Sequence, residues 1–195
     1  MAFDIVSIPM VKPLLNDALV LCLGVPDMPK GYPSFRDWAY NEGAREVDAV
    51  DIIAHKGWEE IKDLNEPQQW RVGYDLVINP GTLEHCFNIG LAWRNAWDAV
   101  FLGGHLFNVF PVSLLDHGFW NMNPVALFDW CSANGGRVVQ THFAINGNAG
   151  KTVYREPIPD GRSGRGCFPP ETVGYALMRK ERELDFTWPT QGAYR

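Results

Sequence analysis

The residues best suited to chemistry in this sequence are two histidines, because a neutral imidazole accepts a proton near pH 7. His85 closes the run Thr82–His85, and His117 opens the segment HGFWNMNP. Each has a structural alternative: His85 suits a hydrogen-bonded cap beside Glu84, and the aromatic residues after His117 suit a core. The mixture of apolar faces and polar tips after His117 is typical of a small-molecule pocket. We predict that His85 and His117 are catalytic bases.

Polar or flexible residues also follow the apolar runs of the first half of the chain. Gly24 ends the first run, and a glycine lets the backbone turn tightly and approach a ligand. Asp51 lies close to the end of the second run, where a carboxylate can accept hydrogen bonds from both hydroxyls of a ribose. Asp63 and Leu64 end the third run, and an acceptor beside an apolar side chain suits the edge and face of an adenine. A strand-end aspartate is also a common helix cap, so the prediction depends on the ordered set.

The elements that would position these residues are short apolar runs alternating with amphipathic segments. This alternation is typical of βαβ units around a parallel sheet, in which ligands bind beyond the carboxyl ends of the strands. Seven runs predict strands: Leu19–Leu23, Val47–Ile53, Ile61–Leu64, Tyr74–Ile78, His105–Phe110, Arg137–Phe143 and Thr172–Met178.

Three segments between these runs predict helices. One is capped by Ser34 and ends at Gly43, and a second covers Glu84–Val100 with apolar residues at three- and four-residue steps. A third starts at Asn123–Pro124 and is closed by Gly135. The Gly- and Pro-rich stretch Asn146–Pro170 predicts a long surface connection, with a functional lid or a partner-binding segment as the alternative.

Several stretches of the chain, from about Asp17 to Tyr194, resemble the class I S-adenosylmethionine-dependent methyltransferases. The resemblance lies in LVLCLG, VDAVDI, IKDL, GGHLFNVFPV and above all YDLVINPGTLEHC. HGFWNMNP is similar to a motif of bacterial and viral methyltransferase-like proteins. The resemblance implies an α/β Rossmann-like three-layer sandwich. Its seven-stranded sheet would be mostly parallel, with an antiparallel last strand, and residues 1–195 would form one domain.

The turn after the first strand departs from the pattern of that family. Cys22 stands at the family's acidic position, and Pro26 and Met28 stand where the family has glycines. Asp27 is then the candidate for the ammonium group of the cofactor. The resemblance implies S-adenosylmethionine as the cofactor, with a small molecule or a sugar hydroxyl as the methyl acceptor. The cofactor-binding residues that we predict are Gly24, Asp27, Asp51, Asp63, Leu64, Asn79 and Glu84.

Two other functions stay open at this point. The departures in the glycine turn also fit a non-catalytic protein of the same fold that serves as a structural or interaction subunit of a larger assembly. Asp51 and Asp63 would equally suit a nucleoside binder that transfers no methyl group. A nicotinamide dehydrogenase is disfavoured, because no GxGxxG follows the first strand.

Composition narrows the class of partner. A net charge of −6 disfavours nucleic acid, and the absence of any apolar run near 18 residues disfavours a membrane span. No HxH or HxxxH pattern occurs, so we expect no metal site. The four cysteines form no CxxC pair, and we expect buried, reduced thiols in a soluble, cytoplasmic protein. Association with itself or with another protein is left open.

Overall fold

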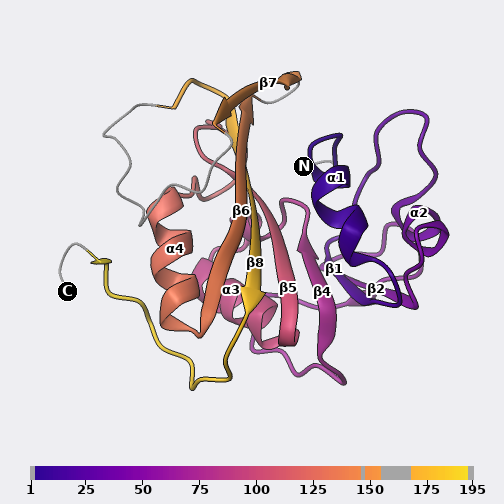
Figure 1. Cartoon of the computed structure of the whole chain (residues 1–195), viewed down its shortest axis with the longest axis horizontal. Coiled ribbons are helices and arrows are strands. Elements are labelled where there is room, and N and C mark those ends of the chain that lie inside the picture. Colours follow the sequence, from indigo (N-terminus) through magenta and orange to yellow (C-terminus); the bar gives the residue numbers. More distant parts are fainter. Residues whose placement is uncertain (1–2, 146–147, 155–167, 193–195) are drawn as a thin grey trace.

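The computed structural model describes residues 3–145, 148–154 and 168–192, which form one mixed sheet with helices on both faces (Figure 1). The helical elements are α1 (Ser7–Val11), α2 (Phe35–Asn41), α3 (Ile89–Asp98), α4 (Pro124–Ala133) and the two 3-10 turns η1 (Lys12–Leu14) and η2 (Leu83–His85). The strands are β1 (Leu19–Leu23), β2 (Glu46–Asp51), β3 (Glu60–Ile61), β4 (Tyr74–Asn79), β5 (Val100–Pro111), β6 (Gly136–Ile145), β7 (Asn148–Tyr154) and β8 (Thr172–Lys180).

The strands of the described residues pair in the order β3-β2-β1-β4-β5-β8-β6-β7. Strands β1 to β5 pair in parallel, whereas β8 is antiparallel to both of its neighbours, β5 and β6. All seven predicted strands are present, and the predicted antiparallel last strand is confirmed. The carboxyl ends of β1, β2, β4 and β5 therefore meet at one edge of the sheet, where a ligand site is expected.

One prediction about the second half of the chain is wrong. The stretch 146–170, expected as a surface connection, contains an eighth strand, β7, which pairs antiparallel with β6 (Figure 1). The edge of β6 would otherwise leave its backbone N–H and C=O groups unpaired, and β7 satisfies part of them. Its residues, NAGKTVY, include one glycine and three polar side chains and show no apolar alternation that would predict a strand. Residues 155–167 of this stretch lie outside the described residues.

The two faces of the sheet carry two separate apolar clusters, because successive side chains of a strand point to opposite sides. In β1, Val20 and Cys22 pack toward α1 and α2, whereas Leu21 and Leu23 pack toward α3 and α4. Figure 1 shows these pairs of helices on opposite sides of the sheet. The continuous apolar run LVLCL is thus explained by burial on both faces.

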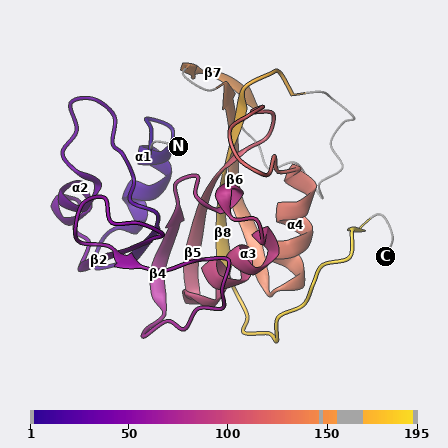
Figure 2. The same cartoon turned by 180° about the vertical axis from the view of Figure 1, so that it is seen from behind.

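A cluster of tryptophans holds α3 and α4 side by side on the second face (Figure 2). The Trp130 ring lies 5.2 Å from that of Trp93 and 5.3 Å from that of Trp97, both nearly edge to face. Trp97 also donates its indole N–H to the carbonyl oxygen of Asn134, at 3.0 Å. These aromatic residues fill the core, so they are not part of a ligand pocket.

The helix boundaries follow the predicted caps in two cases of three. The Ser34 hydroxyl accepts from the Asp37 amide at 3.1 Å and starts α2, and the Asn123 side chain starts α4. The helix expected over 84–100 is shorter than predicted and begins at Ile89, because Cys86 has extended backbone that separates η2 from α3. Helix α1 was not predicted. None of the described helices has the length and apolarity of a membrane-spanning segment.

Candidate functional site

The turn after β1 is packed against the turn after β4. Gly24 has φ +87°, a left-handed conformation that favours glycine, and its amide donates to the Val50 carbonyl at 2.7 Å. A Cβ atom on Gly24 would overlap the hydroxyl oxygen of Thr82. The close approach that this glycine permits is therefore between two loops of the protein. These loops pack against each other at the carboxyl ends of β1 and β4.

Asp51 lies beside this turn, as the strand order requires. One carboxylate oxygen accepts from the Val25 amide at 3.3 Å and the other from the Ile52 amide at 2.8 Å. The imidazole Nε2 of His55 lies 3.9 Å from the second oxygen. The side chain is 14% exposed, and a carboxylate has about four lone-pair positions, so it can still accept from a ligand.

Asp63 and Leu64, the two predicted site residues after β3, lie in different environments. Asp63 accepts from both the backbone and the side-chain amide of Asn65, at 2.8 and 2.9 Å, and so stabilises a turn. Leu64 is buried in the apolar cluster on the α3 face. Its side chain packs into the core and offers no face to a ligand at the strand ends.

Asn79, the last residue of β4, organises the loop that follows it. The residue is 1% exposed, and its side-chain oxygen accepts from the amides of Gly81, Thr82 and Leu83 at 2.7–3.2 Å. Its side-chain nitrogen donates to the Asn108 side chain and to the Val109 carbonyl, both on β5. This side chain thus links β4, β5 and the start of η2, and it fixes the position of Glu84.

Glu84, His85 and His117 form one cluster at this edge. Their ligand atoms lie within 4.8 Å of one another, and Glu84 Oε1 is 3.5 Å from His117 Nε2. The two imidazole rings are 5.1 Å apart. Glu84 is 1% exposed, and neither of its carboxylate oxygens has a hydrogen bond; the same is true of His117 Nε2. The structure therefore brings both predicted bases together around a buried carboxylate.

The electrostatics of this cluster favour uncharged groups. Burial raises the pKa of the Glu84 carboxyl to about 7. Burial also lowers the pKa of His117, and burial together with the neighbouring His117 lowers that of His85. Both imidazoles are thus neutral near pH 7, the form in which a nitrogen lone pair is free to accept a proton or to bind a cation.

Exposed aromatic residues border the cluster. The Phe119 amide donates to the Glu84 carbonyl at 3.0 Å, and the Trp120 indole donates to the Cys86 carbonyl at 3.1 Å. The Phe87 ring, 72% exposed, lies 5.5 Å from that of Phe119 and 6.2 Å from that of Trp120. An exposed apolar group of this kind beside buried polar residues is typical of a binding site. We call Phe87, Phe119 and Trp120 the aromatic rim.

A pocket of about 400 Å³ opens at the turn after β1, between that turn, the start of α2 and the loop after β2. It is lined by Val25, Asp27, Met28 and Lys56, among others, and the Asp27 carboxylate is 3.7 Å from the Lys56 ammonium. Met28 packs against the apolar cluster of the first face. The pocket has the size of a small-ligand site and adjoins the turn that Asp51 contacts.

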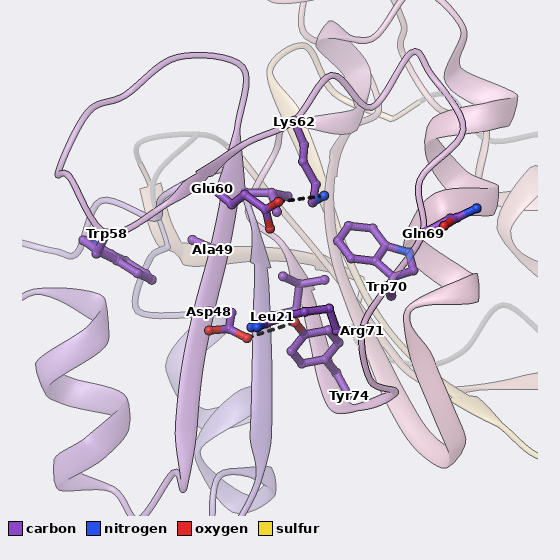
Figure 3. Close-up of a pocket in the computed structure, with 11 residues that line it drawn as sticks. Leu21, Asp48, Ala49, Trp58, Glu60, Lys62, Gln69, Trp70, Arg71 and Tyr74 are labelled. Atoms are coloured by element: carbon purple, nitrogen blue, oxygen red, sulfur yellow. Dashed lines mark hydrogen bonds and ion pairs between the residues drawn. The ribbon is translucent and has the colours of Figure 1, made fainter.

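A second pocket of about 390 Å³ lies on the face of the sheet over β1, β2 and β3 (Figure 3). In Figure 3 the Tyr74 hydroxyl and the Asp48 carboxylate, 2.9 Å apart, form its base, and Trp58 and Trp70 stand on either side. The described segment between β3 and β4 contains no helix, so this part of the face lacks the cover that α3 gives to β4 and β5. None of the predicted site residues lines it.

The prediction about the cysteines and the prediction about a metal site have different outcomes. Cys22, Cys86 and Cys131 are free and buried, as expected, whereas Cys167 lies outside the described residues. We expected no metal site because no HxH or HxxxH pattern occurs. That pattern does not detect ligands that are far apart in the sequence, and Glu84 and His117 are far apart in the sequence but adjacent in space. All three cluster residues were predicted as site residues, but Glu84 was predicted to bind the cofactor, and its contact with His117 was not predicted.

Comparison of the structure with solved structures identifies its fold. It is similar to 1,6-didemethyltoxoflavin-N1-methyltransferase of Burkholderia thailandensis, a structure with bound 1,6-didemethyltoxoflavin and S-adenosylhomocysteine. The TM-score is 0.56 at 17% identity, over 89% of this chain and 76% of that one. An S-adenosylmethionine-dependent methyltransferase of Mesorhizobium loti matches with a TM-score of 0.46 at 13% identity, over 88% and 96%. No protein-family model and no curated protein matches the chain. The chain has the class I methyltransferase-like Rossmann fold.

The contact between the two turns yields a testable prediction. Gly24→Ala is expected to destabilise the protein by about 3 kcal/mol, since it combines left-handed backbone strain with overlap against Thr82. Adding Thr82→Ala removes the overlapping hydroxyl and should restore about half of the loss, which urea unfolding of the two variants measures. Equal stabilities of the single and double variants would show that the two turns do not touch.

Proposed function

We propose that this chain is an S-adenosylmethionine-dependent methyltransferase that methylates a hydroxyl group of a small molecule or sugar. The observation that carries the proposal is the position of Asp51. Its carboxylate is held by two backbone amides at the carboxyl end of β2, beside the Gly24–Val25 turn of the adjacent β1. An acidic side chain at this point of a Rossmann-like sheet is suited to accept from the hydroxyls of a ribose.

The remaining cofactor contacts follow from the same edge. Asp27 lines the pocket beside the turn and is the proposed acceptor for the cofactor ammonium group. Asp63 is proposed for the amino edge of the adenine. Leu64 and Asn79 are proposed to support the site without touching the cofactor. Leu64 packs in the core, and Asn79 holds the loop after β4 in place.

The cluster of Glu84, His85 and His117, with the aromatic rim, is the proposed acceptor side of the site. The rim offers flat apolar surfaces that suit a ring, and the cluster offers polar atoms for a hydroxyl. The Burkholderia enzyme of the same fold is a structure with a small molecule bound, which supports an acceptor of that size. We propose that the cluster holds the acceptor hydroxyl and takes part in the loss of its proton.

The proposed reaction is an in-line displacement at the sulfonium methyl group. The acceptor oxygen forms a bond to the methyl carbon as the carbon–sulfur bond breaks, and the hydroxyl proton passes to a group of the cluster or to water. The products are the methyl ether and S-adenosylhomocysteine. Most of the acceleration in such a reaction comes from holding the two reactants in line, with a smaller contribution from proton removal.

Titration calorimetry with S-adenosylmethionine, S-adenosylhomocysteine and adenosine tests the proposal. We expect one molecule of either cofactor form to bind per chain with a micromolar Kd, and adenosine to bind more weakly. Absence of binding at millimolar cofactor would contradict the proposal and favour the non-catalytic alternative. Equal affinity for adenosine and the two cofactor forms would favour the nucleoside binder.

A further inference from the structure

We propose that Glu84, His85 and His117 bind one divalent first-row transition-metal ion. We further infer, on the basis of the proposed function, that this ion holds the hydroxyl of the methyl acceptor. The first statement concerns the protein alone and does not require a cofactor. The second statement says how the site would bind the hydroxyl of the methyl acceptor.

The distances within the cluster agree with a shared ion. Two ligand atoms at about 2.0–2.1 Å from a tetrahedral ion are about 3.3–3.4 Å apart. Glu84 Oε1 and His117 Nε2 are separated by 3.5 Å, and all three ligand atoms fall within 4.8 Å of one another. His85 is exposed, so its ring can rotate toward the same ion.

The burial of the cluster gives an independent reason to expect a cation. Both oxygens of the Glu84 carboxylate and the Nε2 atom of His117 are buried without a hydrogen bond. A buried polar group without a partner is costly, and a buried carboxylate is especially so. These atoms belong to neighbouring side chains, and an ion between them would give His117 Nε2 and one carboxylate oxygen of Glu84 a partner.

The backbone shows how the loop after β5 is held against Glu84. A Cβ atom on Gly118 would lie 3.0 Å from the Glu84 carbonyl oxygen and 3.1 Å from its Cγ atom. The Phe119 amide donates to the same carbonyl. Because a glycine stands at this position, the loop can approach closely enough for His117 to reach the carboxylate.

The donor set selects the class of metal. Two imidazole nitrogens and one carboxylate suit Zn²⁺, Co²⁺, Ni²⁺ or Fe²⁺, whereas Mg²⁺ and Ca²⁺ prefer oxygen ligands alone. The described residues supply three ligands, which leaves at least one coordination position for water or for a substrate oxygen. A hydroxyl bound there would have a lowered pKa, and its proton would pass to solvent before or during methyl transfer.

Binding of Zn²⁺ and Co²⁺ to chelator-treated protein without a polyhistidine tag tests the proposal. We expect one ion per chain by elemental analysis after dialysis, a micromolar or tighter Kd by calorimetry, and visible absorption bands of bound Co²⁺. At 100 times its Kd, Zn²⁺ should raise Tm by about 5–10 °C. Neither S-adenosylmethionine nor an acceptor is present in these measurements.

Three variants locate the ion. Glu84→Gln and His117→Asn should each weaken Zn²⁺ binding at least 100-fold. His105→Asn, on β5 six residues before the strand ends, is the matched control and should bind as the wild type does. In chelator, His117→Asn should keep the wild-type Tm, because the residue lies in a loop and its Nε2 atom makes no hydrogen bond. Full Zn²⁺ affinity in both cluster variants, or no stoichiometric ion in the wild type, would overturn the proposal.

The two proposals fail separately. Cofactor binding without metal binding removes the metal site and leaves the methyltransferase intact. Metal binding without cofactor binding confirms the ion site and removes the proposed function, and with it the role of the ion in holding a methyl acceptor.

Discussion

Asp51→Ala is expected to weaken binding of S-adenosylmethionine at least 100-fold. The variant loses the acceptor for two ribose hydroxyls, and hydrogen bonds to a charged group contribute about 1.5–3 kcal/mol each. Adenosine binding should fall by a similar factor, since the ribose is common to both ligands. Titration calorimetry of the variant with each ligand measures the two losses.

Two controls separate this effect from loss of structure. Asp51→Asn keeps one acceptor oxygen and should lose about 10-fold in affinity, between the wild type and the alanine variant. Asp98→Ala removes an exposed carboxylate at the end of α3 and should bind cofactor as the wild type does. If the alanine variant binds cofactor with wild-type affinity and a wild-type Tm, Asp51 does not contact the ribose.

Asn79→Ala is expected to destabilise the protein by about 4 kcal/mol and to lower Tm by about 10 °C. The substitution leaves three backbone amides of the loop after β4 without their acceptor and removes two hydrogen bonds to β5. Effects above 4 kcal/mol are rare for a single residue and indicate a broken buried network. Thermal unfolding followed by circular dichroism gives the shift.

The same variant tests whether this side chain positions the acceptor side of the site. With the loop released, Glu84 is no longer held beside His117, so Zn²⁺ binding should fall together with stability. Asn41→Ala, at an exposed position of α2, is the matched control and should change the free energy of unfolding by less than about 0.5 kcal/mol. Wild-type stability in Asn79→Ala would show that the network contributes little.

The strands were predictable because each is a short apolar run that is visible in the sequence itself. Five-residue runs such as LVLCL read as strands buried on both faces, and β1 lies where the run predicts. Strand β7 was not predictable, because its pairing with the edge of β6 is a tertiary interaction that no alternation in its own residues announces. The late start of α3 has a similar cause: the extended backbone at Cys86 follows from the packing of the loop.

The candidate site was predictable where it depends on strand order alone. Gly24 and Asp51 follow adjacent parallel strands, so the turn and the carboxylate had to meet. The Glu84–His117 contact depends instead on a loop that returns from β5 and hydrogen-bonds along residues 84–86. His85, His117 and Glu84 were all predicted to lie at one cleft, but nothing in the spacing of these residues indicates that return, so the direct contact between Glu84 and His117 was not predicted.

The antiparallel strand between β5 and β6 has a consequence for protein synthesis. Residues 172–180 lie between β5 and β6 in the sheet, yet they are translated after both of these strands. Before β8 is translated, β5 and β6 both lack the strand with which they pair. A nascent chain that stops before β8 should therefore be sensitive to proteases and prone to aggregate, and it should become compact only when these last pairing partners emerge.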